Sequence, residues 1–227
     1  MVTHKKCELI QGKLRMDNQT LETYRAVYLT AEDLRIAASI LYNAYHDDPF
    51  FIDSLFTSDK AAYEQKLRAA IREELNTLWQ QKQALIGLFD GERLIGLACV
   101  ITQKIPLGEG RYWHWRLKML LGTGWKSTQA LIKKESSIIE LLPNDRCGIL
   151  QFIALVPNEQ HKGLGHRLVQ AVVSWCDEQP DVEGIGVFVA HESHLQLFTQ
   201  HDFVSLGELS IGCIDGQLLF YVGQQHA

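Results

Sequence analysis

The spacing of hydrophobic positions changes along this chain, and each change predicts an element of secondary structure. Apolar residues that alternate predict strands, and those that recur every three or four positions predict amphipathic helices. An Asp-Gly pair between two apolar runs predicts a hairpin turn, here at Asp90-Gly91. The first half is therefore expected to hold a strand, two helices and a hairpin, over residues 24–29, 34–46, 59–78 and 84–102.

Polar residues support the ends of the two predicted helices. Thr30 and Asp33 have the spacing of a capping pair in front of the first helix. Pro49 ends that helix, because the residue before a proline disfavours the helical region. Ser58 is the candidate N-cap of the second helix.

The second half alternates strands and helices after a glycine-rich interruption at 103–146, a predicted insert with helical segments around 111–121 and 126–142. The expected elements that follow are a strand, a helix, a strand, a short helix and two closing strands, over 148–156, 163–178, 185–190, 193–201, 203–211 and 217–222. This order predicts a mixed α/β sheet with helices on its faces. Residues 1–22 form an unpatterned N-terminal extension, and residues 23–227 are expected to form a single domain.

Composition narrows the class of protein. An apolar fraction of 46% and a charged fraction of 22% are typical of a soluble globular domain. A formal charge of −5 argues against nucleic-acid binding, and the absence of a long apolar window argues against a membrane span. The five cysteines are scattered and never form a CxxC pair, so we expect reduced thiols, no metal site and a cytoplasmic location. No secretory signal is indicated at the N-terminus.

The most informative segment is the apolar run 149–156, followed by a short polar loop and a helix that starts near Gly163 and Gly165. A helix N-terminus with glycines presents free backbone N–H groups, and these can bind a phosphate. A dinucleotide fingerprint would require a third glycine where Leu168 stands, and a Walker A loop would require Lys and Ser or Thr after the last glycine. The glycines could also simply begin a tightly packed helix.

The segment resembles the motif V-x-P-x-x-Q/R-x-x-G-x-G/A of the GNAT superfamily of N-acetyltransferases. It reads Leu155-Val-Pro157-Asn-Glu-Gln160-His-Lys-Gly163-Leu-Gly165. Downstream, the family's Asn and its Y-x-x-x-G-F ending keep their spacing but are replaced at three positions, which hold His191, Phe198 and Asp202. The segment 44–50 is also similar to the start of small-molecule acetyltransferases, so the resemblance extends from about residue 23.

The resemblance implies a GNAT-like acyl-CoA N-acyltransferase fold of about seven strands, with the helical insert between the third and fourth strands. It implies that the pantetheine arm of acetyl-CoA adds to the fourth strand like an extra strand, and that the glycine loop wraps the pyrophosphate. The residues that it assigns to acetyl-CoA are Ile153, Ala154, Leu155, Gln160, His161, Lys162, Gly163, Leu164, Gly165, His166, His191 and Phe198.

The catalytic groups are less well defined by the resemblance. The family's tyrosine, which protonates or hydrogen-bonds the sulfur, is Phe198 here, and the glutamate that histone acetyltransferases place on the central strand is Ile149. No catalytic acid is therefore assigned. His191 is the candidate general base, because imidazole titrates near neutral pH. The alternatives are that it replaces the family's Asn as a hydrogen-bonding contact, or faces solvent.

The predicted insert is the least generic part of the chain. Its first helical segment carries two apolar stripes, which could contact the core together with an acceptor pocket, a partner subunit or the second segment. Residues 104–146 contain eight Lys or Arg against four Asp or Glu, which favours an acceptor with a carboxylate or phosphate. The two stripes and the C-terminal strand are also compatible with a homodimer.

The sequence therefore predicts an acetyl-CoA-dependent N-acetyltransferase that acetylates a primary amine of a small molecule by direct attack in a ternary complex. The alternative is a catalytically weak acyl-CoA-binding sensor with the same fold, because the usual catalytic positions are substituted. A nicotinamide or flavin dinucleotide protein is a third hypothesis, which requires a doubly wound parallel sheet.

Overall fold

The computed structural model describes residues 24–55, 59–102, 133–212 and 214–225. The predicted N-terminal extension, Ser58 and most of the predicted insert lie outside these residues. Of the insert, the described part is helical over 133–139, within the segment expected to be helical.

A seven-stranded mixed sheet forms the centre of the protein. Its strands lie in the order β1-β2-β3-β4-β5-β7-β6, and every neighbouring pair is antiparallel except β4 and β5. The strands are β1 Tyr24–Tyr28, β2 Ala84–Asp90, β3 Arg93–Thr102, β4 Cys147–Leu155, β5 Gly184–Val189, β6 Val204–Ile211 and β7 Ile214–Val222. The predicted mixed sheet is confirmed, whereas the dinucleotide hypothesis is not supported, because one parallel pair is not a doubly wound sheet.

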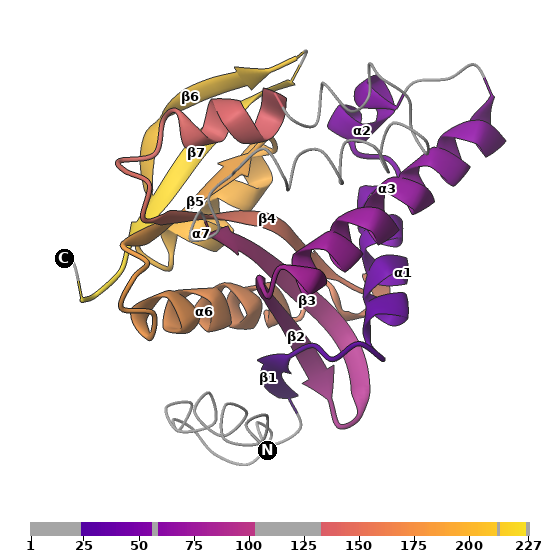
Figure 1. Cartoon of the computed structure of the whole chain (residues 1–227), viewed down its shortest axis with the longest axis horizontal. Coiled ribbons are helices and arrows are strands. Elements are labelled where there is room, and N and C mark those ends of the chain that lie inside the picture. The colour runs from indigo at the N-terminus through magenta and orange to yellow at the C-terminus, as the bar shows by residue number, and fades with distance from the viewer. Residues whose placement is uncertain (1–23, 56–58, 103–132, 213, 226–227) are drawn as a thin grey trace.

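Helices cover both faces of the sheet (Figure 1). Helices α1 Leu34–Tyr45, α2 Pro49–Ser54 and α3 Lys60–Gln80 pack on one face, and α6 Leu164–Asp177 and α7 Leu195–Thr199 on the other. Each face has its own buried apolar cluster, because successive side chains of a strand point to opposite sides. The central strands are consequently apolar on both faces, as the continuous run in β4 indicated.

Two helix starts differ from prediction. Asp48 accepts hydrogen bonds from the backbone N–H groups of Phe50 and Phe51, so a short helix, α2, begins directly where α1 was expected to stop. Six residues are too few to produce a readable periodicity. The predicted N-cap Ser58 is wrong: Asp59 caps α3 and accepts from the N–H groups of Ala61 and Ala62. The Thr30–Asp33 pair is confirmed, with the Thr30 N–H and hydroxyl each 2.7 Å from one Asp33 oxygen.

Toward the C-terminus the predicted order holds with adjusted boundaries. The expected helix over 193–201 is a 3-10 turn, η3 Glu192–His194, followed by the single turn of α7. Strand β7 begins at Ile214, three residues before the prediction, because it pairs with β6 directly after a tight turn. Three cysteines, Cys99, Cys147 and Cys176, are buried free thiols. None of the helices described is long and apolar enough to cross a membrane.

Candidate functional site

The two parallel strands in the middle of the sheet separate from one another. Strand β4 pairs with β5 only from Cys147 to Ile149, where Ile149 faces Gly186. Strand β4 nevertheless runs on to Leu155 and β5 to Val189. Residues 150–155 therefore have no strand partner on this side within the described chain. We call the space between the separated ends the strand gap.

Hydrogen-bond alternation shows which backbone groups of β4 face the strand gap. In an antiparallel pair, every second residue directs both its N–H and its C=O toward the neighbouring strand. Val156 donates to the carbonyl of Ile95 at 2.8 Å, so Ala154, two positions earlier, also faces β3. Ile153 and Leu155 lie between these positions. Their backbone groups therefore face the gap, whereas those of Ala154, which was assigned to the cofactor with them, do not.

Two side chains bind the gap-facing groups of β4. The Tyr45 hydroxyl donates to the carbonyl of Ile153 and accepts from the N–H of the same residue. The hydroxyl oxygen lies 3.2 Å from each of these two backbone atoms. The Gln160 side-chain amide donates to the carbonyl of Leu155 at 3.3 Å. Backbone groups that lack a strand partner must find another one when partly buried, and these contacts supply it. The residue assigned from the motif, Gln160, thus lies at the gap.

Tyr45 reaches the gap from the last turn of α1. Its ring packs edge-on against Phe152 of β4 and Phe51 of α2, with centroid distances of 5.5 Å and 5.8 Å. These contacts fix the ring direction and leave the hydroxyl at the strand edge. Burial raises the pKa of Tyr45 well above its usual range, so the phenol stays protonated near neutral pH.

The loop after β4 has the backbone of an anion site. A 3-10 turn, η2 Pro157–Glu159, leads to His161 and Gly163, which have φ angles of 60° and 77° with an ordinary residue between them. Such an alternation of backbone hand directs successive N–H groups to one side of the chain. Gly163 is the N-cap of α6, and no side chain caps this helix end. A Cβ added at Gly163 would meet nothing within 4 Å, so the space beside it is open.

The second motif glycine has a different role. A Cβ on Gly165 would lie 3.3 Å from the Cδ1 atom of Leu197, so the absence of a side chain allows α6 and α7 to pack closely. Leu164 is buried in the cluster below α6 and cannot contact a ligand through its side chain. Of the two glycines, Gly163 thus supplies the unusual backbone angle, and Gly165 supplies close helix packing.

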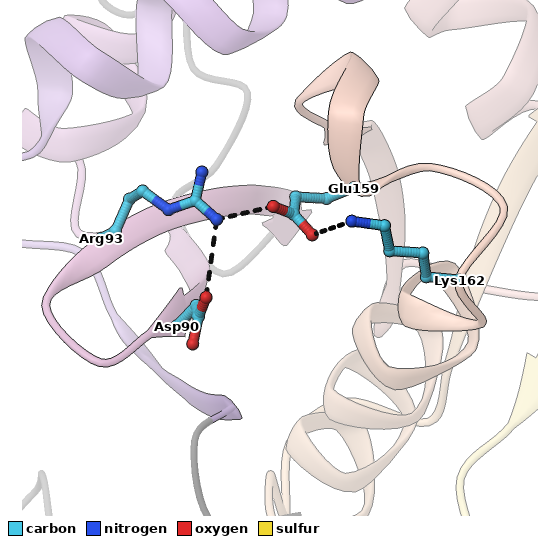
Figure 2. Close-up of polar contacts among 4 residues, drawn as sticks. All are labelled: Asp90, Arg93, Glu159 and Lys162. Carbon is cyan, nitrogen blue, oxygen red and sulfur yellow. Dashed lines mark hydrogen bonds and ion pairs between the residues drawn. The ribbon is translucent and has the colours of Figure 1, made fainter.

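A chain of ion pairs holds this loop from outside (Figure 2). Glu159 is largely buried and accepts from Arg93 at 2.6 Å and from Lys162 at 3.0 Å, while Arg93 also contacts Asp90 at 3.5 Å. Hydrogen bonds from Arg93 and Lys162 lower the pKa of Glu159. Lys162, assigned to acetyl-CoA, thus has its ammonium group directed to Glu159 in this structure.

Histidines stand after the end of β5 and in the first turn of α6. His191 follows the end of β5, Val189, by two residues; its side chain is exposed, and its ring centroid lies 5.7 Å from that of His194. His166, in the first turn of α6, has its Nδ1 atom 3.2 Å from Nε2 of His201. The pKa of His201 is lowered, mainly by burial and in second place by the nearby His166 ring.

Two positions that carry catalytic groups in the resembling family lie in the apolar clusters. Ile149 is buried on the α1 face, and Phe198 is buried on the α6 face with its ring edge-on to Phe203. Neither side chain is chemically able to transfer a proton. Gln151 is the extra residue of a β-bulge, since Phe152 faces Cys99 and Leu150 faces Val100.

Sequence reasoning missed the position of Tyr45 and the role of Arg93. Tyr45 falls in the apolar stripe of α1, and such a position by itself indicates only a core residue. The available signal was its hydroxyl, because a tyrosine in an apolar stripe requires a hydrogen-bond partner. Arg93 carried no comparable signal, since a charged residue after a hairpin turn is usually solvated.

The model of the acetyltransferase (GNAT) family matches residues 40–203, which is more than half of the chain. This protein belongs to the GNAT acetyltransferase family. A comparison with curated proteins found no match.

Solved structures agree with this fold. A protein from Corynebacterium glutamicum described as histone acetyltransferase HPA2 and related acetyltransferase has a TM-score of 0.67 at 15% identity, over 87% of this chain and 95% of its own. A putative arylalkylamine N-acetyltransferase 7 from the mosquito Aedes aegypti has a TM-score of 0.62 at 10% identity, over 88% and 87%. A Vibrio cholerae spermidine N-acetyltransferase, solved with CoA and spermine, has a TM-score of 0.54 at 16% identity, over 90% and 98%.

Proposed function

We propose that this protein transfers the acetyl group of acetyl-CoA to a primary amine of a small molecule. The observation that carries the proposal is the edge of β4 at Ile153 and Leu155. These residues present backbone donors and acceptors with no strand partner in the described chain. They lie beside the loop 160–165, which we call the phosphate-type loop. The pantetheine arm contains two amides and can pair with such an edge as a strand would.

The loop fits the other end of the same substrate. The uncapped N-terminus of α6 and the left-handed residues His161 and Gly163 favour the pyrophosphate through backbone N–H groups and the helix dipole. The open space beside Gly163 lets the phosphate oxygens approach the backbone. One substrate with an anionic end and an amide-containing arm satisfies both features.

In the proposed reaction the neutral amine attacks the thioester directly while both substrates are bound. His191 is the candidate base, because it directly follows the separated end of β5 and its side chain is exposed. The acceptor is proposed to be a small amine that carries a carboxylate or phosphate, from the positive excess of the predicted insert. A cytoplasmic location and a homodimer remain parts of this proposal.

A second function, an acyl-CoA-binding module without turnover, is favoured by one observation. The positions of the family's tyrosine and strand glutamate hold Phe198 and Ile149, and both are buried in apolar clusters. Such a module would bind acetyl-CoA through the same edge and loop. It differs from the enzyme only in the absence of acetyl transfer.

Calorimetric titration with acetyl-CoA, with NADH as the control ligand, tests the binding site. Gly163→Asp should abolish acetyl-CoA binding, because it places a carboxylate where the pyrophosphate is proposed to lie. Gly91→Asp is the matched control: Gly91 also has a positive φ, 57°, and open space around it, but it lies in the β2–β3 turn. Equal loss in both variants, or no acetyl-CoA binding by the wild type, would contradict the proposal.

Thiol release from acetyl-CoA over an amine panel separates the enzyme from the binding module. The panel should contain matched pairs of amines with and without a carboxylate or phosphate. Faster release with the anionic member of a pair supports the proposed acceptor class. Binding without release for any amine would favour the module.

A further inference from the structure

The Tyr45 hydroxyl lies at the gap-facing edge of β4. It contacts both polar backbone groups of Ile153, each at 3.2 Å. A hydroxyl has one hydrogen to donate and two lone pairs, so it can exchange one of these contacts for a ligand atom without losing the other. The hydroxyl is therefore placed to contact whatever binds along this edge.

The position along the edge identifies which part of an acyl-CoA lies there. An arm whose phosphates lie at the loop enters from the Leu155 end of β4 and passes Leu155 before Ile153. Beyond Ile153 the bulge at Gln151 interrupts the edge, and at Ile149 the strands are paired again. Ile153 is thus the last gap-facing residue before the bulge, and the end of the arm that carries the thioester lies beside it.

This end of the arm requires a proton donor that the fold does not supply at the usual position. The departing thiolate must gain a proton, and the buried Phe198 has none to give. Within the described residues, Tyr45 is the hydroxyl that hydrogen-bonds the β4 edge inside the gap. Resting on the function proposed above, we propose that Tyr45 is the catalytic acid, taking the role that Phe198 cannot perform.

The proposed step conserves protons. The amine nitrogen forms a bond to the thioester carbon, and the carbon–sulfur bond breaks as the carbonyl re-forms. The Tyr45 hydroxyl gives its proton to the departing sulfur, which leaves as the CoA thiol. His191, the candidate base, takes the surplus proton of the nitrogen and returns it through water to the resulting phenolate. Tyr45 ends protonated, and no other reactant is consumed.

The surroundings of Tyr45 suit a donor. Phe51 and Phe152 hold its ring, so the hydroxyl keeps its direction without loss of side-chain freedom at each turnover. Burial raises the pKa of Tyr45; the hydrogen bond with the Ile153 backbone opposes this shift, and the carboxylate of Asp48 adds to it. The phenol is therefore protonated before each reaction. Because a raised pKa also makes it a weaker acid, the transfer of its proton to sulfur requires that the nitrogen's proton return to the phenolate in the same step.

The thiol pKa of bound CoA tests the contact without a known acceptor. A hydrogen bond from Tyr45 favours the thiolate, so the thiol pKa of CoA bound to the wild type should lie about one unit or more below that in Tyr45→Phe. The pKa is obtained from the rate of S-alkylation of CoA against pH, with alkylated CoA quantified by chromatography. Phenylalanine keeps the ring contacts, so the variant is expected to fold.

Tyr63→Phe is the matched control. Its hydroxyl also donates to a backbone carbonyl, that of His46 at 2.7 Å, but it lies outside the strand gap. It should leave the thiol pKa at the wild-type value. An equal thiol pKa of CoA bound to the wild type and to Tyr45→Phe would overturn the assignment. This holds whatever the affinity of the variant for CoA. A wild type that fails to bind CoA in calorimetry would instead overturn the proposed function.

Turnover gives an independent readout once an acceptor is found. Tyr45→Phe should lower kcat about 10- to 100-fold while KM for acetyl-CoA changes less than about threefold, because the hydroxyl acts on the leaving group. A rise in KM with unchanged kcat would show that Tyr45 only assists binding, and this result would overturn the proposal.

Discussion

The guanidinium of Arg93 donates to the carboxylate of Glu159 at 2.6 Å, although the two residues are 66 positions apart. Arg93 begins β3 at the end of the hairpin turn, and Glu159 ends the 3-10 turn in front of the phosphate-type loop. This ion pair joins the hairpin to the loop (Figure 2). The loop is thus held in shape by a residue from another part of the sheet.

Arg93→Met should weaken acetyl-CoA binding about 3- to 10-fold, because a loop that is less restricted loses more entropy when it orders around the pyrophosphate. Calorimetry with acetyl-CoA measures the change. Arg25→Met is the control, since Arg25 pairs at 2.9 Å with Glu92 on the same hairpin and does not touch the loop. Equal affinities in the two variants would show that the ion pair does not organise the loop.

Glu159 should contribute to acid sensitivity. Its pKa is lowered in the folded protein, first by the hydrogen bond from Arg93 and then by that from Lys162. The folded state therefore favours the ionised carboxylate. This contribution is fully present above the unfolded glutamate pKa of about 4.3 and is lost as the pH falls through the lower folded value.

Urea unfolding between about pH 3 and 6 measures this effect. The free energy of unfolding should depend less steeply on pH in Glu159→Gln than in the wild type, because the amide does not titrate. Glu92→Gln changes a carboxylate whose side chain is 96% exposed and should keep the wild-type slope. A wild-type slope in Glu159→Gln would contradict the prediction.

Gly165 is expected to be required for packing. Gly165→Val places methyl groups against Leu197, whose Cδ1 atom is already 3.3 Å from an added Cβ. Overpacking of this kind lowers the free energy of unfolding by about 1–3 kcal/mol. Chemical denaturation of Gly165→Val, Leu197→Ala and the double variant measures the coupling. The double variant should lose less free energy of unfolding than the two single variants lose together. A loss equal to their sum would exclude the contact as the cause.

The contact of His166 with His201 should make stability fall below neutral pH. Burial and His166 lower the pKa of His201, so the folded protein favours the neutral ring. The contribution is present above the unfolded histidine pKa of about 6.5 and is lost as the pH falls through the lower folded value. Because His201 is partly exposed, the loss should stay below about 1 kcal/mol.

His201→Gln separates this contact from the other histidines. Glutamine keeps a hydrogen-bonding group near His166 but does not titrate. Urea unfolding at pH 5 and pH 7.5 should show a smaller difference in this variant than in the wild type. Burial and His191 also lower the pKa of His194, so His194→Gln should reduce the difference independently, and the double variant should show the sum of the two reductions. An unchanged difference in His201→Gln would refute the assignment.

Local patterns were sufficient for most elements. The hairpin at Asp90-Gly91 was predictable because the turn residues and the strand alternation are encoded within a few positions. Helix α6 was predictable because its apolar stripe and its glycine start lie in one segment. Helix α2 was not predictable, because six residues are too few to show a helical periodicity. Its N-cap Asp48 also precedes a proline, which indicates the end of a helix.

The candidate site also has a part that the sequence could predict and a part that it could not. The glycine loop from Gln160 to Gly165 could be predicted because its motif is contiguous. The role of Tyr45 could not, because its partner Ile153 is 108 positions away and is contacted through backbone atoms. A residue of any type at position 153 presents the same N–H and C=O groups. No side-chain pattern therefore records the contact.

The amino-acid order by itself determined the class of fold, the position of the phosphate-type loop and the absence of the usual catalytic tyrosine at Phe198. The strands and helices follow from side-chain periodicity, whereas the loop and the role expected at position 198 follow from contiguous motifs that resemble the GNAT family. Only the tertiary structure decided which backbone groups of β4 lack a partner and which side chains bind them. That choice depends on where β4 and β5 separate and on the packing of α1 against β4, and both are set by contacts between distant segments.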